Sequence, residues 1–293
     1  VKIIAPVGFM DHAVSENVYA GNAMNRRLFY QYGVLLPASP FGYAGQGLGQ
    51  GVASGDITLI PPTRIIEEDI EVLVVDGVKM EFQNTPNTEA PSEMNTWFPD
   101  LKVLWMAENA TGTMHNIYTL RGAQVRDALA WSKFISRALY LFGQEAEVMF
   151  ASHHWPRWGN DRVQEVLKGQ RDAYAHLNNQ VLHYANQGVT INQIHNVYEI
   201  PASLQEKWYC RGYHGSPEHN ARGVIQRFLG FAELVAGGRH LVREPVHRTV
   251  HRGRVDQIAR GRSQHVGRHG VGGSRIERHS VQLDVRDRHR CTH

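Results

Sequence analysis

Residues 103–109 read VLWMAEN, an apolar run that ends in Glu108 and an asparagine. Continuous apolar runs of this length are typical of strands buried on both faces of a sheet. A second run, VMFAS at residues 148–152, is followed directly by His153 and His154. Because strand ends hold side chains rigidly at a sheet edge, the two runs predict an α/β core with a carboxylate and an imidazole at a cleft. Adjacent strand side chains point to opposite faces, so at most one of the two histidines should face that cleft.

Further extended segments precede these runs. Residues 72–75 and 78–82 are strand-like and flank Asp76-Gly77, a dipeptide that strongly favours a hairpin turn. Residues 57–60, ITLI, predict another strand, and the N-terminal residues 1–6 resemble the end of one. Up to residue 155 the pattern is therefore mixed α/β.

Helical periodicity appears between the two apolar runs and again after Pro156. A stripe at three- and four-residue spacing predicts a helix over 125–142, stopped by Gly143. A longer helix should be capped by Asn160 and end at Gly188. Its apolar stripe is close to heptad spacing and consists of Val163, Leu167, Tyr174, Leu177, Val181 and Tyr184.

Three later helix starts carry capping signals. Thr190 with Gln193, and Ser203 with Glu206, have capping-box spacing. Residues 216–229 begin with Ser-Pro-Glu, which favours a helix through Leu229. We therefore predict a helical domain after the sheet domain.

The composition excludes several classes of protein. The two cysteines, Cys210 and Cys291, are far apart, so neither a disulfide framework nor a CxxC metal knuckle is indicated. No apolar stretch reaches the roughly 18 residues needed to span a bilayer. Residues 42–55 form a glycine-rich loop that lacks GxGxxG and a P-loop lysine, which argues against nucleotide binding.

The C-terminal residues differ from the rest in composition. Residues 237–293 contain 13 Arg and 8 His against 5 Asp or Glu, and no Lys, Phe, Tyr or Trp. Such a segment has little with which to build a core, so it is predicted to be disordered or poorly packed. Three interpretations stay open: a solvated tail, a basic nucleic-acid-binding tail, or an out-of-frame translation of a GC-rich gene. Nucleic-acid tails usually include Lys and stacking aromatics, which this segment lacks.

Glu89, Glu108 and His153 are the candidate metal ligands. Glu89 follows the hairpin in a turn-rich stretch, and a carboxylate directly after an apolar strand, as at Glu108, is hard to leave unpaired. Carboxylate and neutral imidazole suit zinc or a similar divalent metal. Taken singly, each residue also fits a bland role as a solvated, capping or core side chain. His12 has no neighbouring ligand pair and is read as structural.

The segment after Glu108 should line the same cleft. It offers the imidazole of His115, the amide of Asn116 and the guanidinium of Arg121. Histidine can protonate a leaving oxygen near neutral pH, and arginine gives an oxyanion two parallel charge-assisted bonds. The alternative is a loop satisfied by its own polar residues.

Five long strings resemble one family of enzymes. They are GFMDHAVSENVYAGNAMNRR (8–27), NTPNTEAPSEMNTWFP (84–99), MAENATGTMHNIYTLRGAQVRDALAWSKFI (106–135), FASHHWPRWGN (150–160) and RGYHGSPEHNARGVIQRFLG (211–230). In this order they are similar to the bacterial linear and secondary alkyl sulfatases of the metallo-β-lactamase superfamily. The resemblance covers roughly residues 1–231.

This resemblance implies a partial αββα sandwich followed by an α-helical dimerisation domain. We expect the catalytic part over 1–155, the dimerisation domain over 156–236, and an unrelated tail over 237–293. The implied activity is zinc-dependent hydrolysis of alkyl sulfate esters, such as dodecyl sulfate, to an alcohol and inorganic sulfate. The implied partners are a small alkyl sulfate and a second copy of the chain.

The family's site residues carry over by motif. Glu89, Glu108 and His153 match zinc ligands of a two-zinc site, with one glutamate shared between the ions. His115 resembles the acid for the departing group, and the implied sulfate contacts are Asn116, Arg121, Arg157, Tyr213 and His214. The family's HxHxDH motif occurs nowhere in the chain. We therefore expect an N-terminally truncated fragment that lacks four ligands and has little or no activity by itself.

Two other functions stay open at this point. One is a non-catalytic helical dimer with a basic nucleic-acid-binding tail, although nucleic acid is the less favoured partner. The other is a different hydrolase of the same superfamily acting on a neutral acyl substrate. Localisation is left open, although the family is often periplasmic or secreted, and no membrane span is expected.

Overall fold

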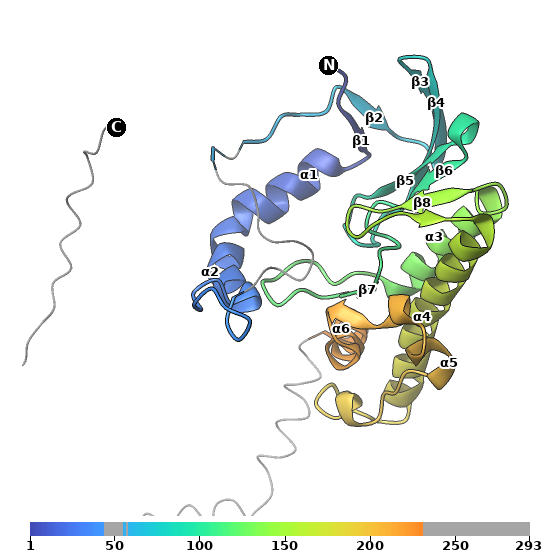
Figure 1. Ribbon diagram of the computed structural model, residues 1–293. Helices are drawn as coiled ribbons and strands as arrows, with labels where there is room; N and C mark the ends of the chain where they lie inside the picture. Colours follow the sequence, from blue (N-terminus) through green and yellow to red (C-terminus); the bar gives the residue numbers. More distant parts are fainter. Residues whose placement is uncertain (44–54, 57, 231–293) are drawn as a thin grey trace, which may run out of the picture. The chain divides into compact units, whose positions relative to one another are not determined.

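A six-stranded mixed sheet forms the centre of the protein. The computed structural model describes residues 1–43, 55–56 and 58–230, all within one compact unit, Val1–Gly237. The strand order is β3-β4-β5-β6-β8-β9, and every neighbouring pair is antiparallel except β6 and β8. The strands are β3 (Ile70–Val75), β4 (Val78–Asn84), β5 (Met94–Phe98), β6 (Val103–Trp105), β8 (Val148–Phe150) and β9 (Arg157–Trp158) (Figure 1).

The predicted hairpin is confirmed by β3 and β4. Their register closes with Val75 opposite Val78. Asp76 and Gly77 both adopt positive φ, at 52° and 80°. Two central residues with positive φ match the right-handed twist of the flanking strands, which is why Asp-Gly is favoured here.

The two apolar runs are neighbouring parallel strands. In β6 and β8, Val103 pairs with Val148 and Trp105 with Phe150. Parallel strands need a crossover connection, and α3 (Ala128–Leu141) supplies it. This helix starts later than predicted, because Asp127 caps it by accepting a hydrogen bond from the Ala130 N–H at 2.9 Å. Side chains at equal distances past the ends of β6 and β8 therefore lie side by side.

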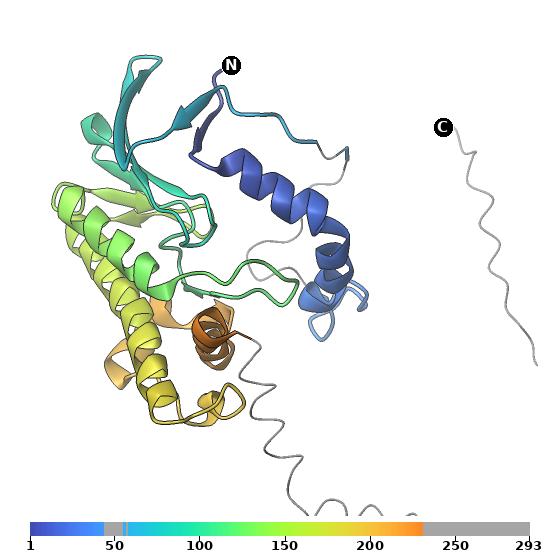
Figure 2. The same cartoon turned by 180° about the vertical axis from the view of Figure 1, so that it is seen from behind.

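Helix α4 (Asn160–Asn186) lies against α3, and both views show the two helices side by side (Figure 2). The predicted apolar stripe is buried from Val163 to Val181. The stripe joins sheet residues such as Leu104 and Met149 in one hydrophobic core. The domain boundary at 155/156 stays a prediction.

The expected cap at Asn160 is wrong. Gly159 is the N-cap, and Asn160 is the first helical residue. The Asn160 Nδ2 group instead donates to the carbonyls of Gly143, Gln144 and Ala146 at 2.8, 3.2 and 2.9 Å. Its amide therefore ties the start of α4 to the turn after α3. The predicted end of α4 holds, since Gly188 has φ 88° two residues past the helix.

Of the remaining helix-start predictions, the one at Ser216 is confirmed and the one at Ser203 is wrong. Ser216 caps α6 (Pro217–Leu229) by accepting from the His219 N–H, as predicted. Thr190 and Gln193 are hydrogen-bonded to each other ahead of the 3₁₀ turn η3 (Ile194–Asn196). The capping box at Ser203 is wrong, because that residue lies inside α5 (Ala202–Gln205). The short 3₁₀ turn η4 (Trp208–Cys210) follows α5.

The N-terminal segment adds a small parallel pair and two helices. Strand β1 (Ile4–Pro6) pairs with β2 (Arg64–Ile66). A π-helical turn, η1 (Ser15–Tyr19), joins α1 (Phe9–Val14) to α2 (Gly21–Tyr32). The strand predicted at 57–60 is wrong for residues 58–60, which are irregular. Residue 57 and most of the glycine-rich loop, like the C-terminal tail, lie outside the described residues.

A second parallel pair lies beside the main sheet. Strand β7 (Met114–His115) pairs with β10 (Gly212–His214), which immediately precedes α6. Within the described part of the chain, no helix is both long and apolar enough to cross a bilayer.

Candidate metal centre

Glu108 and His153 meet because of the register of β6 and β8. Each lies three residues beyond the paired residues Trp105 and Phe150. The His153 Nε2 atom is 2.9 Å from Glu108 Oε1. This carboxylate oxygen is buried and has no hydrogen-bond partner among the described residues. The two atoms are at ion-pair distance, so a protonated His153 would pair with this carboxylate.

Only one of the two adjacent histidines faces Glu108, as predicted. His154 adopts positive φ, at 71°, and its Nδ1 accepts from the Gly112 N–H at 3.1 Å. A Cβ on Gly112 would lie 2.7 Å from the His154 ring, so this close approach requires glycine.

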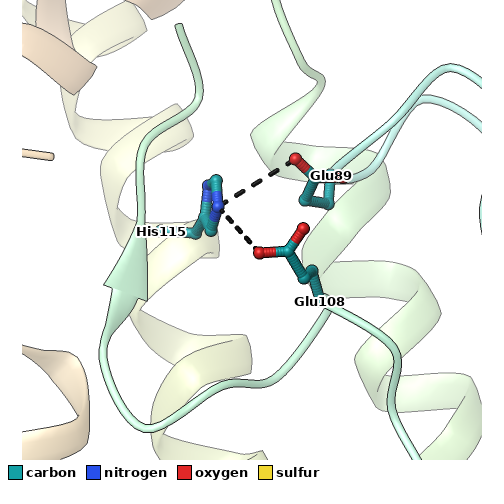
Figure 3. Close-up of side chains that lie close together, drawn as sticks. All are labelled: Glu89, Glu108 and His115. Atoms are coloured by element: carbon teal, nitrogen blue, oxygen red, sulfur yellow. Dashed lines mark ion pairs between the residues drawn. The ribbon is translucent and has the colours of Figure 1, made fainter. Parts of the chain in front are cut away.

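Glu89 and His115 complete a tight group with Glu108. The His115 Nε2 atom lies 3.4 Å from Glu108 Oε1 and 4.0 Å from Glu89 Oε1. One ligand atom from each of the three residues lies within 4.8 Å of the others. Figure 3 shows the three side chains pointing toward one another from separate segments. We call Glu89, Glu108 and His115 the carboxylate–imidazole cluster.

The tautomer of His115 follows from its surroundings. Its side chain is almost fully buried, and Nδ1 lies 2.9 Å from the carbonyl oxygen of Asn116. A ring nitrogen so close to a carbonyl must carry the proton, so the other nitrogen, Nε2, faces the carboxylates. Strand β7 thus directs Nε2 at the same point as Glu108 Oε1.

Arg126 is the main site residue that the sequence did not indicate. Its NH2 group pairs with Glu89 Oε1, and NH1 donates to the carbonyl and Oδ1 of Asn116 at 2.8 and 2.5 Å. Its side chain is 8% exposed. The residue lies just before the cap of α3, where no periodicity marks it. Its place one residue before Asp127 within a long family-like string was the available signal.

A buried amide network fixes the loops that carry the two glutamates. The Asn109 Nδ2 group donates to Thr85 Oγ1 at 3.0 Å and to Asn95 Oδ1 at 2.8 Å. The Trp131 indole N–H donates to the Asn109 carbonyl at 2.8 Å. Since buried amides are costly to leave unpaired, this network holds the chain around Glu108 in place.

Charges in the site shift two carboxyl groups in opposite directions. Burial alone would raise the pKa of Glu108, but the imidazoles of His115 and His153 and the guanidinium of Arg126 outweigh it and lower that pKa. For Glu93, burial followed by repulsion from Glu89 raises the pKa to about 8. Glu108 is therefore ionised at neutral pH, whereas Glu93 keeps its proton.

His214 and Asn116 also lie at the cluster. The His214 ring packs edge-on against His115 with centroids 4.7 Å apart. Burial, followed by the neighbouring His115, lowers the pKa of His214 to about 4. The Asn116 Nδ2 group donates to the His214 carbonyl at 2.8 Å. Strand pairing between β7 and β10 thus brings together residues nearly one hundred positions apart.

The other predicted substrate contacts lie elsewhere. Arg121 pairs with Glu16 at 2.6 Å in a cavity of about 340 Å³. The Arg157 NH1 group donates to the Trp155 carbonyl at 3.3 Å, and Tyr213 is 64% exposed. None of these three contacts Glu89, Glu108 or His115.

The donor set fits a divalent metal of the zinc type. The carboxylates of Glu89 and Glu108 and the imidazole of His153 are the candidate donors, and His115 Nε2 lies beside both carboxylates. Nitrogen and oxygen donors of this kind are usual for zinc. Arg126 already pairs with Glu89, so a bound ion would share that carboxylate with the guanidinium.

Comparisons with known proteins show the family of the chain. A family model described as alkyl sulfatase dimerisation matches residues 190–236. The linear primary-alkylsulfatase of a Pseudomonas species is 48% identical over 231 residues, covering 79% of this chain and 34% of that protein. This chain is an alkyl sulfatase homologue. It spans about a third of the length of such curated relatives.

Two further sulfatases are similar to this chain. The alkyl/aryl-sulfatase BDS1 of Saccharomyces cerevisiae is 48% identical over 79% of this chain and 36% of its own length. The solved stereoselective inverting sec-alkylsulfatase Pisa1 from Pseudomonas sp. superposes with a TM-score of 0.77 at 46% identity, covering 79% of this chain and 37% of that chain. The predicted mixed α/β architecture and the alkyl sulfatase dimerisation region are confirmed.

Proposed function

We propose that this protein takes part in zinc-dependent hydrolysis of alkyl sulfate esters to an alcohol and inorganic sulfate. The observation that carries the proposal is the cluster of Glu89, Glu108 and His115, with His153 Nε2 2.9 Å from Glu108, in a homologue of alkyl sulfatases. The two glutamates and His153 would hold zinc, with Glu108 between the two imidazoles. Zinc supplies a Lewis acid and an ionised water at neutral pH.

His115 is the proposed acid. Its Nδ1 proton is engaged by the Asn116 carbonyl, so Nε2 is the atom that can hold and deliver a proton. A proton on Nε2 would lie beside the carboxylates of Glu108 and Glu89. From there it passes to the departing oxygen as the ester bond breaks.

Arg126 and Asn116 are the proposed contacts for the sulfate group. Arg126 is the guanidinium that lies at the cluster, and a planar guanidinium suits a tetrahedral oxyanion. Its NH1 group fixes the Asn116 side chain through Oδ1. The His214 ring packs edge-on against the His115 ring.

The cavity beside Arg121 is the proposed place for the alkyl chain. Its lining is partly apolar, including Ala20, Ala23 and Met24. It shares Pro91 and Gln124 with a second cavity of about 320 Å³ that Arg126 lines. An amphiphile with its sulfate near Arg126 could therefore extend its chain toward Arg121; in the alternative pose the sulfate lies at Arg121, as the resemblance implies.

A homodimer is also proposed. The dimerisation match at 190–236 includes four exposed apolar side chains. They are Val197, Trp208, Phe228 and Leu229, which are 38%, 41%, 52% and 46% exposed. Covering such residues is the usual driving force for association.

Sulfate release from dodecyl sulfate tests the proposed activity. The protein expressed from its whole gene should release sulfate only with zinc, and Glu108→Gln should lose at least about 100-fold in rate. The 293-residue chain alone is expected to be far slower, because two carboxylates and one imidazole leave a two-zinc site short of ligands.

Two results would contradict the activity. One is release that persists unchanged in a zinc chelator. The other is faster turnover of a neutral carboxylic ester than of dodecyl sulfate, which would favour a different hydrolase. Arg121→Ala separates the two substrates, since it should raise KM for the sulfate ester and leave the neutral ester unaffected.

A further inference from the structure

We propose that Asn220, in the region matched as alkyl sulfatase dimerisation, is a positioning residue for the imidazole of His115 in the same chain. The chemical role of His115 rests on the proposed function, whereas the positioning contact rests on geometry. Asn220 lies on α6 and is 2% exposed. Its amide makes two hydrogen bonds, both to the segment that carries His115.

These two bonds hold the backbone on either side of Asn116. The Asn220 Nδ2 group donates to the His115 carbonyl at 3.2 Å. The Ile117 N–H donates to Asn220 Oδ1 at 3.0 Å. One side-chain amide therefore acts as both donor and acceptor across three consecutive residues, a geometry that a carboxylate or an alkyl group does not reproduce.

Helix α6 supports the same segment at neighbouring points. The His219 Nε2 atom lies 2.9 Å from the Tyr118 carbonyl, and the two rings stack. A Cβ on Gly223 would lie 3.1 Å from the Ile117 side chain, so α6 is in close contact with the segment that follows β7. The segment is thus held along its length by α6.

The opposite side of His115 is held by α4. The His115 N–H donates to the hydroxyl oxygen of Tyr174 at 3.0 Å, and Tyr174 is fully buried. Its ring stacks on Trp131 with centroids 4.4 Å apart. Side chains from two helices consequently satisfy both backbone groups of His115.

Fixing this backbone fixes the imidazole. The tautomer of His115 depends on the bond between its Nδ1 and the Asn116 carbonyl, which lies between the two groups that Asn220 holds. A shift of that carbonyl would break its hydrogen bond with the Nδ1–H group. The ring could then rotate and turn Nε2 away from Glu108. His115 is not itself a proposed zinc ligand, but its Nε2 faces the proposed ligand Glu108, and outer partners of a ligand commonly change metal affinity by about 10- to 100-fold.

The experiment compares Asn220→Ala with a matched control, Asn178→Ala. Asn178 is also a buried helical asparagine, at 3% exposed, but among the described residues its Nδ2 donates only to Asn179 Oδ1. Zinc affinity is measured by calorimetry on the 293-residue chain. The tautomer of His115 is read by long-range ¹H–¹⁵N NMR of the zinc-free chain, with His115→Gln identifying its signal.

We expect Asn220→Ala to weaken zinc binding by about 10-fold and to shift the His115 imidazole toward mixed tautomers. Asn178→Ala should change neither. If Asn220→Ala does not fold, Asn220→Asp keeps the acceptor for Ile117 and loses only the donor to His115, and the same shifts are expected.

The outcomes separate this inference from the proposed function. Wild-type chain that binds no zinc, with the His115 tautomer still altered by the Asn220 variant, would overturn zinc binding by this chain and support the positioning role. Unchanged His115 signals in a folded Asn220 variant would overturn the positioning role, whatever the zinc affinity.

Discussion

Glu108 lies between the imidazoles of His115 and His153, and this position defines the site at the residue scale. Its Oε1 atom is 3.4 Å from one Nε2 and 2.9 Å from the other. The oxygen is buried and lies within ion-pair distance of both ring nitrogens, so the imidazoles compensate its charge. A shared carboxylate of this kind fits the expectation of one glutamate serving two ions.

Glu93 gives a pH-dependent prediction. Its pKa rises from the ordinary 4.5 to about 8 in the folded chain, mainly because of burial. Its contribution to stability is therefore fully present below pH 4.5 and is lost as the pH rises toward 8, where the unfolded state has already ionised. In zinc-free chain, Glu93→Gln should become progressively more stable than wild type over that range.

Urea unfolding at a series of pH values measures this difference. Glu145→Gln, a substitution at an exposed glutamate, should run parallel to wild type throughout. A stability difference between Glu93→Gln and wild type that does not change with pH would contradict the raised pKa.

The sequence predicted some site residues and missed others for a physical reason. Glu108 and His153 follow apolar strands, so strand ends alone placed them at one edge. Arg126 follows His115 by 11 residues in the chain, and no local sequence pattern indicates that the two side chains meet. The segment after Glu108 already indicated His115, whereas the resemblance supplied His214, and the meeting of the two rings requires the β7–β10 pairing.

At the scale of elements, most strand, hairpin and helix-stripe predictions were correct. Two of the predicted helix starts, at Asn160 and Ser203, were wrong. The Asp-Gly hairpin, the β6 and β8 runs and the α4 stripe depend on local sequence, and each was predicted correctly. Asn160 has a good capping side chain, but nearby carbonyls compete for it. Ser203 lies inside a four-residue helix that a capping box does not begin.

Asn160→Ala should destabilise the protein through the junction of α3 and α4. Three carbonyls lose their common donor, so the expected loss in free energy of unfolding is about 1–3 kcal/mol. Asn186→Ala, at the exposed last residue of α4, should stay within about 0.5 kcal/mol of wild type. Equal urea midpoints for the two variants would contradict the role given to Asn160.

At the scale of the whole molecule, the helical region serves two proposed purposes. It carries the dimerisation match, and its α6 helix holds the segment that bears His115. Association and catalysis would then depend on neighbouring faces of the same helix. The exposed face includes Phe228, and the buried face includes Asn220.

Phe228→Asp should convert the dimer to a monomer. A charge at a buried apolar contact is strongly unfavourable, and Phe228 is 52% exposed in the single chain. Light scattering after size-exclusion chromatography gives the mass of wild type and variant. Tyr140→Asp, an exposed aromatic position on α3 outside the matched region, should remain dimeric. Loss of the dimer in both variants, or in neither, would contradict this interface.

Zinc calorimetry on wild type and Glu108→Gln tests the central claim, that Glu108 is the shared carboxylate of a metal site. The glutamine keeps the size of the side chain and removes the charge that the two imidazoles and Arg126 stabilise. We predict saturable zinc binding to wild type and a loss of affinity of about 100-fold in Glu108→Gln. Equal zinc affinity in the two proteins would contradict the account.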